Sequence, residues 1–125
     1  MSARLVVRLA IASLLAAAGL PAVGAGDAAR GKDLYETTCV TCHSVDANKV
    51  GPAHRGVFGR KAGSAPGYAY SSALAGSKVV WNEESLARWL TDPEKFIPGQ
   101  KMGVSVDDPK EREDLVAYLK TLAAK

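Results

Sequence analysis

The sequence is poor in the residues that build most metal and redox sites. Its 125 residues include two cysteines, two histidines and two methionines. A structural zinc site uses four ligands, commonly in two well-separated pairs. Beside Cys39, Cys42 and His43, and apart from the initiating methionine, the remaining soft ligands are His54 and Met102. The chain therefore lacks a second ligand pair, and a zinc site is excluded.

Aromatic residues make up only 6% of the chain, and no basic run interleaves with them. Proteins that bind nucleic acid usually carry such a basic surface, so we expect no nucleic-acid partner. The sequence also shows no alternating strand pattern, no internal repeat and no interdomain linker. These absences leave one small all-α domain with a marginal core of its own. A bound apolar cofactor would supply the missing core volume.

Residues 1–25 have the pattern of a cleavable secretory signal peptide. Two arginines precede an apolar run from Leu9 to Leu20, and small residues then lead to a cleavage position after Ala25. An uncleaved membrane anchor is the alternative, but the run is only just long enough to span a bilayer and is broken near its end. Cleavage predicts an exported, periplasmic domain of residues 26–125 with no stable membrane insertion. Removing the two arginines from 16 basic residues leaves 14 against 13 acidic residues, a net charge of +1.

The two cysteines lie in the segment CVTCHSV, residues 39–45. A Cys-x-x-Cys disulfide closes too short a loop to stabilise the chain much. A thioredoxin-like redox pair would follow a strand, whereas the preceding GDAARGKDLYETT is typical of a helix. His43 completes Cys-x-x-Cys-His, the attachment motif of c-type haem. The thiols of Cys39 and Cys42 then form thioethers to the porphyrin vinyl groups, and the imidazole of His43 can be the proximal iron ligand.

Met102 is the strongest candidate for the opposite iron ligand. It is the only methionine left after signal-peptide cleavage, and it lies in the Pro- and Gly-punctuated segment IPGQKMG, far along the chain from His43. A methionine that fills a gap in the core is the alternative. His54 is not expected to bind the iron, because a lone histidine is more often a core or surface residue than a ligand.

Periodicity and capping residues predict three helices. The first spans residues 27–38 with an aspartate as N-cap, and another begins at Asn82 and ends near residues 92–93. The last begins at Asp108, with Glu111 placed for a capping box. The segment between Cys42 and Trp81 is dense in Gly and Pro and is predicted to form loops.

Three further segments follow the haem motif in order: GPAHRGVFGRKAGSAPGYAYSSAL, VVWNEESLARWLTDPEKFIPGQKM and KEREDLVAYLK. With them, residues 26–125 resemble the soluble class I cytochromes c of the mitochondrial and related bacterial type. The resemblance implies the cytochrome c fold, with about four to five short helices and long loops wrapped around one covalent haem c. It also implies ligation of the iron by His43 and Met102.

The same resemblance assigns further residues to the haem. The Pro52 carbonyl is expected to accept a hydrogen bond from the ring N–H of His43. The positions matching those that hydrogen-bond or neutralise the haem propionates are Arg60, Tyr70, Trp81 and Gln100. Gln100 stands where the family usually has a threonine, and an amide can make the same bond. His54 stands where the family usually has a leucine against the haem.

Two functions are compatible with these features. The first is a monomeric, non-enzymatic carrier of one electron between respiratory or other redox proteins, such as a membrane oxidase or reductase or a periplasmic dehydrogenase. The second is a small peroxidase-like haem enzyme or ligand sensor, which needs an open iron position and a distal acid–base group. Met102 argues against an open position, and His54 is the only residue that favours the second function.

Overall fold

The computed structural model describes residues 26–125, and the expected signal peptide lies outside them. Within these residues the chain forms five helices and no strand, apart from one isolated bridge between Lys61 and Val80. The helices are α1 (Ala28–Thr38), α2 (Ser72–Ala75), α3 (Glu83–Thr91), α4 (Pro93–Phe96) and α5 (Pro109–Thr121). The prediction of an all-α fold with about four to five short helices is confirmed. None of the helices in residues 26–125 has the length and apolar character needed to span a bilayer.

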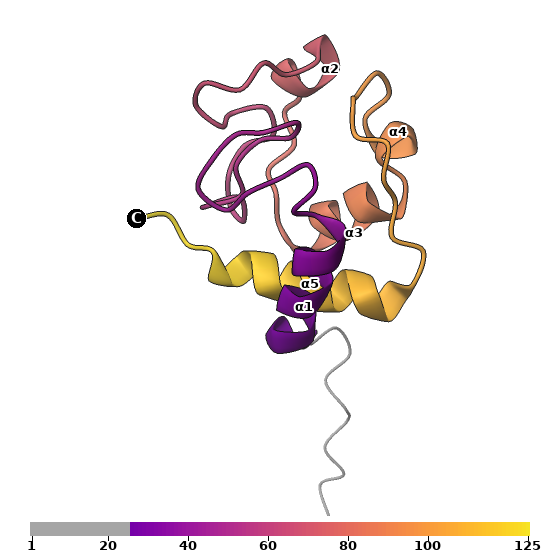
Figure 1. The fold of residues 1–125 in the computed structure, drawn as a ribbon. Coiled ribbons are helices and arrows are strands. Elements are labelled where there is room, and N and C mark those ends of the chain that lie inside the picture. Colours follow the sequence, from indigo (N-terminus) through magenta and orange to yellow (C-terminus); the bar gives the residue numbers. More distant parts are fainter. Residues whose placement is uncertain (1–25) are drawn as a thin grey trace, which may run out of the picture.

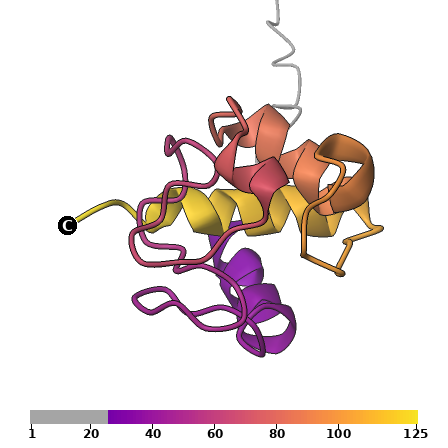
Figure 2. The same cartoon turned by 90° about the horizontal axis from the view of Figure 1, so that it is seen from above.

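The first and last helices cross at the base of the fold, and the other elements lie to one side of them (Figures 1 and 2). The crossing depends on Gly31, where a Cβ atom would collide with the backbone carbonyl of Asp114 and approach the Tyr118 β-carbon to 2.9 Å. Tyr35 and Leu115 are each only 2% exposed. The missing side chain of Gly31 therefore lets the two helix backbones touch.

A buried carboxylate holds this crossing together. Asp114 is 3% exposed, and it accepts hydrogen bonds from the backbone N–H of Asp27 at 2.7 Å and from Arg30 Nε at 2.9 Å. Lys110 Nζ lies 3.2 Å from Oδ1 of the same carboxylate. The hydrogen bond from Arg30 is the main cause that lowers the pKa of Asp114 to about 2. The buried carboxylate of Asp114 is thus paired with one cation from α1, Arg30, and one from α5, Lys110.

Helix starts agree with the sequence, with one exchange of capping motifs. Asp27 caps α1, and Asp108 caps α5 by accepting from the backbone N–H groups of Lys110 and Glu111. The capping box expected at α5 is not formed, because no bond returns from the Glu111 side chain within the described residues. The capping box occurs instead at α3, between Asn82 and Ser85.

Two of the five helices, α2 and α4, differ from the three that periodicity and capping residues predict. Asp92 ends α3 and also accepts from the backbone N–H of Lys95, so it caps α4 directly afterwards. The four-residue α2 lies inside the segment expected to be loop, and Ser71 caps it. Both helices are single turns, which are too short to produce a period of 3.6 residues in the sequence.

Backbone hydrogen bonds attach the long loop after α1 to the rest of the domain. The N–H of Gly56 donates to the carbonyl of Leu122 at 2.5 Å, just beyond α5. The N–H of Gly59 donates to the carbonyl of Trp81 at 2.6 Å, and the N–H of Trp81 donates to the carbonyl of Arg60 at 2.9 Å. These bonds place residues 56–60 beside the residue that follows α5 and beside the segment that leads into α3.

Gly31→Ala should destabilise the protein, although alanine is normally the better helix former. The added methyl group must push α1 away from α5, which should lower the free energy of unfolding by about 1–3 kcal/mol. Denaturant unfolding followed by circular dichroism measures this change. Asp33→Ala is the control, since Asp33 is an exposed residue of the same helix, and it should stay within about 0.5 kcal/mol of the unmodified protein. Equal stability of the two variants would contradict the close crossing.

Asp114→Asn should lower the free energy of unfolding at pH 7 by about 2 kcal/mol, because charge-assisted hydrogen bonds are lost from a buried group. The folded-state pKa of Asp114, about 2, lies below the ordinary carboxyl value. Its contribution is therefore complete above the unfolded pKa of about 4 and is lost as the pH falls toward 2. Denaturant unfolding across pH 2–7 should show the difference between variant and parent closing over that window. The exposed Asp33→Asn on α1 should stay within about 0.5 kcal/mol of the unmodified protein at pH 7.

Candidate functional site

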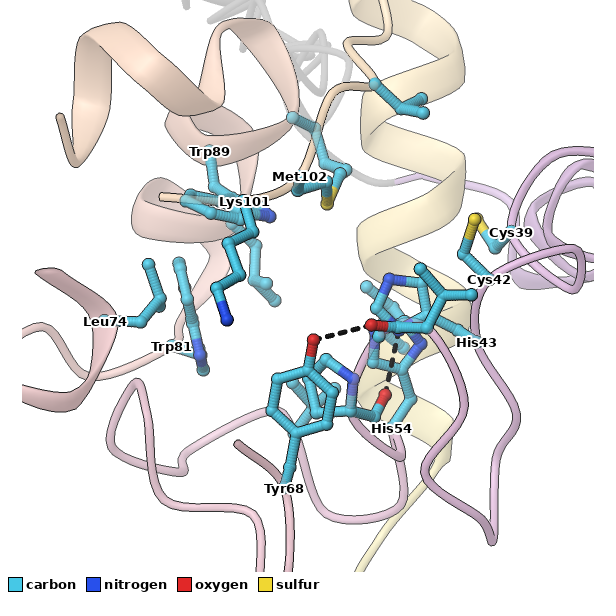
Figure 3. A pocket seen from close by; sticks show the side chains of 18 of the residues that line it. Cys39, Cys42, His43, His54, Tyr68, Leu74, Trp81, Trp89, Lys101 and Met102 are labelled. Atoms are coloured by element: carbon cyan, nitrogen blue, oxygen red, sulfur yellow. Dashed lines mark hydrogen bonds between the residues drawn. The ribbon is translucent and has the colours of Figure 1, made fainter. Parts of the chain in front are cut away.

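A cavity of about 310 Å³ lies between the loop after α1 and the segment after α4, and its lining is predominantly apolar. Figure 3 shows Cys39, Cys42 and His43 on one side of it, and Met102 with Trp89 on the other. The cysteine motif that follows α1 and the segment that follows α4 thus face each other across the cavity. A volume and lining of this kind are typical of a site for an apolar ligand or cofactor.

Most of the residues singled out from the sequence line this cavity. They are Cys39, Cys42, His43, Pro52, Arg60, Tyr70, Trp81 and Met102. Gln100 is the exception. Its Oε1 accepts from the backbone N–H of Met102 at 2.5 Å, and its Nε2 donates to Glu94 at 3.1 Å. The amide is therefore engaged by its own loop and by α4, away from the cavity where the family resemblance placed it.

The turn after α1 presents His43 to the cavity. The N–H groups of Cys42 and His43 both donate to the carbonyl of Cys39, at 3.1 and 2.8 Å. The His43 Nδ1 lies 2.8 Å from the carbonyl oxygen of Pro52. Since a carbonyl can only accept, Nδ1 carries the proton and Nε2 keeps its lone pair. Burial lowers the pKa of His43, which favours a neutral imidazole that can bind a metal.

Gly51 makes room for this imidazole. A Cβ atom at Gly51 would collide with Cε1 of the His43 ring. The N–H of Gly51 also donates to the carbonyl of Cys42 at 2.7 Å, which ties the two loop segments together. The ring of His43 therefore lies in a cradle that only glycine can form.

The two cysteines are free of each other and partly buried. Burial raises the pKa of the Cys39 thiol to about 11. Reactive redox cysteines need a low pKa, since the thiolate is the attacking species. The environment of Cys39 therefore disfavours a thioredoxin-like redox pair. The helix that precedes the cysteines disfavours it as well.

Arg60 is held at the cavity wall with one donor unused. Its terminal nitrogens donate to the carbonyl oxygens of Arg55 at 3.2 Å and Ala53 at 3.0 Å. Its Nε is buried and has no hydrogen-bond partner among the described residues. Leaving a charged donor buried without an acceptor is unfavourable. The cavity therefore suits a ligand with an anionic or polar group that accepts a hydrogen bond from Arg60 Nε.

Two tyrosines border the same space. The hydroxyl oxygen of Tyr70 accepts from the backbone N–H of Ala65 at 3.0 Å, so its own proton stays available for a second acceptor. Tyr68 donates to the carbonyl of Val50 at 2.6 Å and closes the edge of the cavity. Sequence reasoning missed Tyr68, because a tyrosine in a glycine-rich loop carries no motif that marks it.

His54 lies on the same side of the cavity as His43. The two imidazole rings stack with centroids 4.0 Å apart and 21° between their planes. The Nδ1 of His54 is 2.9 Å from the Tyr35 hydroxyl. Burial lowers the pKa of His54 to about 3, so the ring is neutral at pH 7. His54 thus fills a place beside His43 and does not face it across the cavity.

Comparison with known proteins identifies the class. The family model for cytochrome c matches residues 28–123. Cytochrome c from Euglena viridis is 47% identical over 100 residues, covering 78% of this chain and 98% of that protein. Cytochrome c2 from Rhodopila globiformis is 45% identical over 100 residues, covering 78% and 94%. Cytochrome cH from Methylobacterium extorquens superposes with a TM-score of 0.73 at 47% identity, over 77% of this chain and 99% of that one.

The chain belongs to the cytochrome c family, and its cofactor is one covalently bound haem c. The residues present fit that group. The unused Arg60 Nε suits a propionate. The Pro52 carbonyl leaves Nε2 of His43 unprotonated, Gly51 makes room for the ring, and the cavity lining is predominantly apolar. Membership of this family supports a role as an electron carrier.

Proposed function

We propose that the protein carries one electron at a time through a haem c that is attached by Cys39 and Cys42 and ligated by His43 and Met102. The observation that carries this proposal is the placement of Met102 across an apolar cavity from His43, whose Nε2 is free to ligate (Figure 3). The haem supplies an iron that changes oxidation state by one electron, and ligation by methionine and histidine raises its reduction potential.

Residues around the cavity hold the two proposed iron ligands, His43 and Met102, in place. The carbonyl of Pro52 keeps the proton on Nδ1 of His43 and orients the ring, which raises its basicity as a ligand. The amide of Gln100 accepts from the backbone N–H of Met102 and so holds the methionine segment. These bonds hold the ring of His43 and the backbone at Met102, so neither ligand has to move when the oxidation state changes. A carrier needs this property, since rearrangement would slow electron exchange.

Arg60 and Tyr70 are the residues that we assign to the haem propionates. Arg60 offers a buried cationic N–H without a partner, and Tyr70 offers a hydroxyl proton. A carboxylate brought into an apolar cavity requires such donors. Trp81 is 6% exposed and lines the same wall, and it is the third residue of this group.

We propose that the mature protein, residues 26–125, acts in the periplasm with other redox proteins as partners. The pattern of the first 25 residues supports export, and the similarity to a bacterial cytochrome c2 supports the same compartment. Lys101 lines the cavity together with Val50 and Val104, which are 73% and 42% exposed. These exposed lining residues offer a cation and apolar side chains, so a partner with a weakly acidic, partly apolar surface suits them.

A peroxidase-like enzyme receives no support from the geometry. Such an enzyme needs an acid–base group on the open side of the iron. Among the cavity-lining residues His54 is the only imidazole besides His43, and it stacks on His43. We therefore propose a carrier and not an enzyme.

Met102→Ala in the mature holoprotein tests this function. With the sixth ligand removed, the absorption band of the methionine–ferric iron bond should vanish, and the ferrous protein should bind carbon monoxide rapidly at neutral pH. The parent should bind it slowly and should exchange electrons reversibly with oxidase-containing membranes of the host. Val104→Ala, another cavity-lining change, should behave like the parent. An unchanged ferric spectrum in Met102→Ala would show that another group binds the iron.

Arg60→Gln should lower the reduction potential of the holoprotein. Removing a partly buried positive charge beside the haem favours the more positive ferric state over the ferrous state. Voltammetry at pH 7 measures the change. Arg55→Gln is the matched control, because Arg55 lies on the same loop but pairs with Asp46, with Nε 2.5 Å from Oδ1. If both variants shift the potential equally, Arg60 has no special relation to the haem.

A further inference from the structure

A partly buried polar pair joins α1 to the loop that faces the cavity. The Tyr35 hydroxyl lies 2.9 Å from Nδ1 of His54. Tyr35 is 2% exposed. Its ring packs edge-on against His54, with centroids 5.6 Å apart, and at a tilt against Tyr118, with centroids 5.1 Å apart. A hydroxyl and an imidazole nitrogen buried together are stable only while they remain bonded. The position of the His54 ring is therefore tied to a helix that does not itself carry His54.

The His54 ring in turn covers one face of His43. The centroids are 4.0 Å apart and the planes differ by 21°, which is close to parallel stacking. The hydrogen bond from Nδ1 of His43 to the Pro52 carbonyl fixes one edge of the ring. That bond by itself allows the ring to turn about the line that joins the two atoms. A flat neighbour against the ring face removes this freedom, and Gly51 lies against the ring as well.

We propose that Tyr35 and His54 are positioning residues that set the plane of the His43 imidazole. This inference rests on the proposed function, in which His43 binds the haem iron. The Tyr35 hydroxyl holds His54 in place, and the face of His54 holds the plane of His43. Rotation of His43 would then require His54 to move and to break its hydrogen bond to Tyr35.

The same helix turn anchors both sides of this arrangement. The backbone carbonyl of Tyr35 accepts from the N–H of Cys39 at 2.9 Å, so the residue that holds His54 also ends the helix before the cysteine motif. His54 is itself fixed by its N–H, which donates to the carbonyl of Ser44 at 3.0 Å, next to His43. Tyr35, His54 and His43 therefore form one connected unit. An aliphatic side chain at position 54 would fill the space without being held in one orientation.

The first arm of the test compares ferric holoproteins by proton nuclear magnetic resonance. The paramagnetic shifts of the haem methyl groups depend on the orientation of the axial imidazole plane. Tyr35→Phe and His54→Leu should each change the pattern of these shifts, and the Nδ1 proton of His43 should exchange with solvent roughly five- to tenfold faster. Tyr118→Phe is the matched control, since the Tyr118 hydroxyl makes no hydrogen bond within residues 26–125. That variant should keep the parental pattern.

The second arm separates positioning from stability. The double variant Tyr35→Phe/His54→Leu has no unpaired polar group, so its resistance to denaturant should return close to that of the parent. Its methyl-shift pattern should nevertheless remain altered, because the flat, anchored ring is absent. A parental pattern in the double variant would overturn the proposal and leave the pair a purely structural role.

The two proposals fail in different ways. If the unmodified ferric protein lacks the spectrum of histidine and methionine ligation, the proposed function fails and this inference fails with it. If that spectrum is present but Tyr35→Phe and Tyr118→Phe give the same pattern as the parent, only the positioning role is overturned.

Discussion

The contact between α1 and α5 at Gly31 is the constraint on which the haem site depends. Because Gly31 has no side chain, the two backbones touch, and the paired carboxylate of Asp114 holds them there. The last turn of α1 then leads directly into the cysteine motif through the bond from the N–H of Cys39 to the carbonyl of Tyr35. The angle at which the helices cross therefore determines where Cys39 and Cys42 are presented.

The loops form the other walls of the cavity, and they have little regular structure of their own to hold them. Their order comes from bonds to distant parts of the chain, such as that from the N–H of Gly56 to the carbonyl of Leu122 and that from the N–H of Gly59 to the carbonyl of Trp81. This explains how a domain with five short helices can enclose an apolar space. Arg60 Nε is buried in that space without a partner, and we propose that a haem propionate is its acceptor.

The chemistry open to the site depends on which polar side chains reach the cavity and on the side from which they reach it. Both histidines are kept neutral by burial, which lowers the pKa of each, and they lie on one side of the cavity. Met102 lies on the other side, with its backbone N–H bonded to Gln100. No second imidazole faces Met102 within the described residues. This arrangement supports the role of an electron carrier that membership of the family indicates.

The sequence by itself determined the features that depend on neighbouring residues. Cys39, Cys42 and His43 identify the haem motif by spacing alone, and Asp27 and Asp108 mark helix starts because a cap bonds within its own first turn. Periodicity did not predict the helices α2 and α4, because a single helical turn leaves no periodic pattern in the sequence. Only the tertiary structure decided that Gln100 bonds Glu94 and Met102 instead of facing the cavity. It also decided that His54, 19 residues from Tyr35 along the chain, meets its hydroxyl, because side-chain partners that come from different elements are chosen by packing and not by local order.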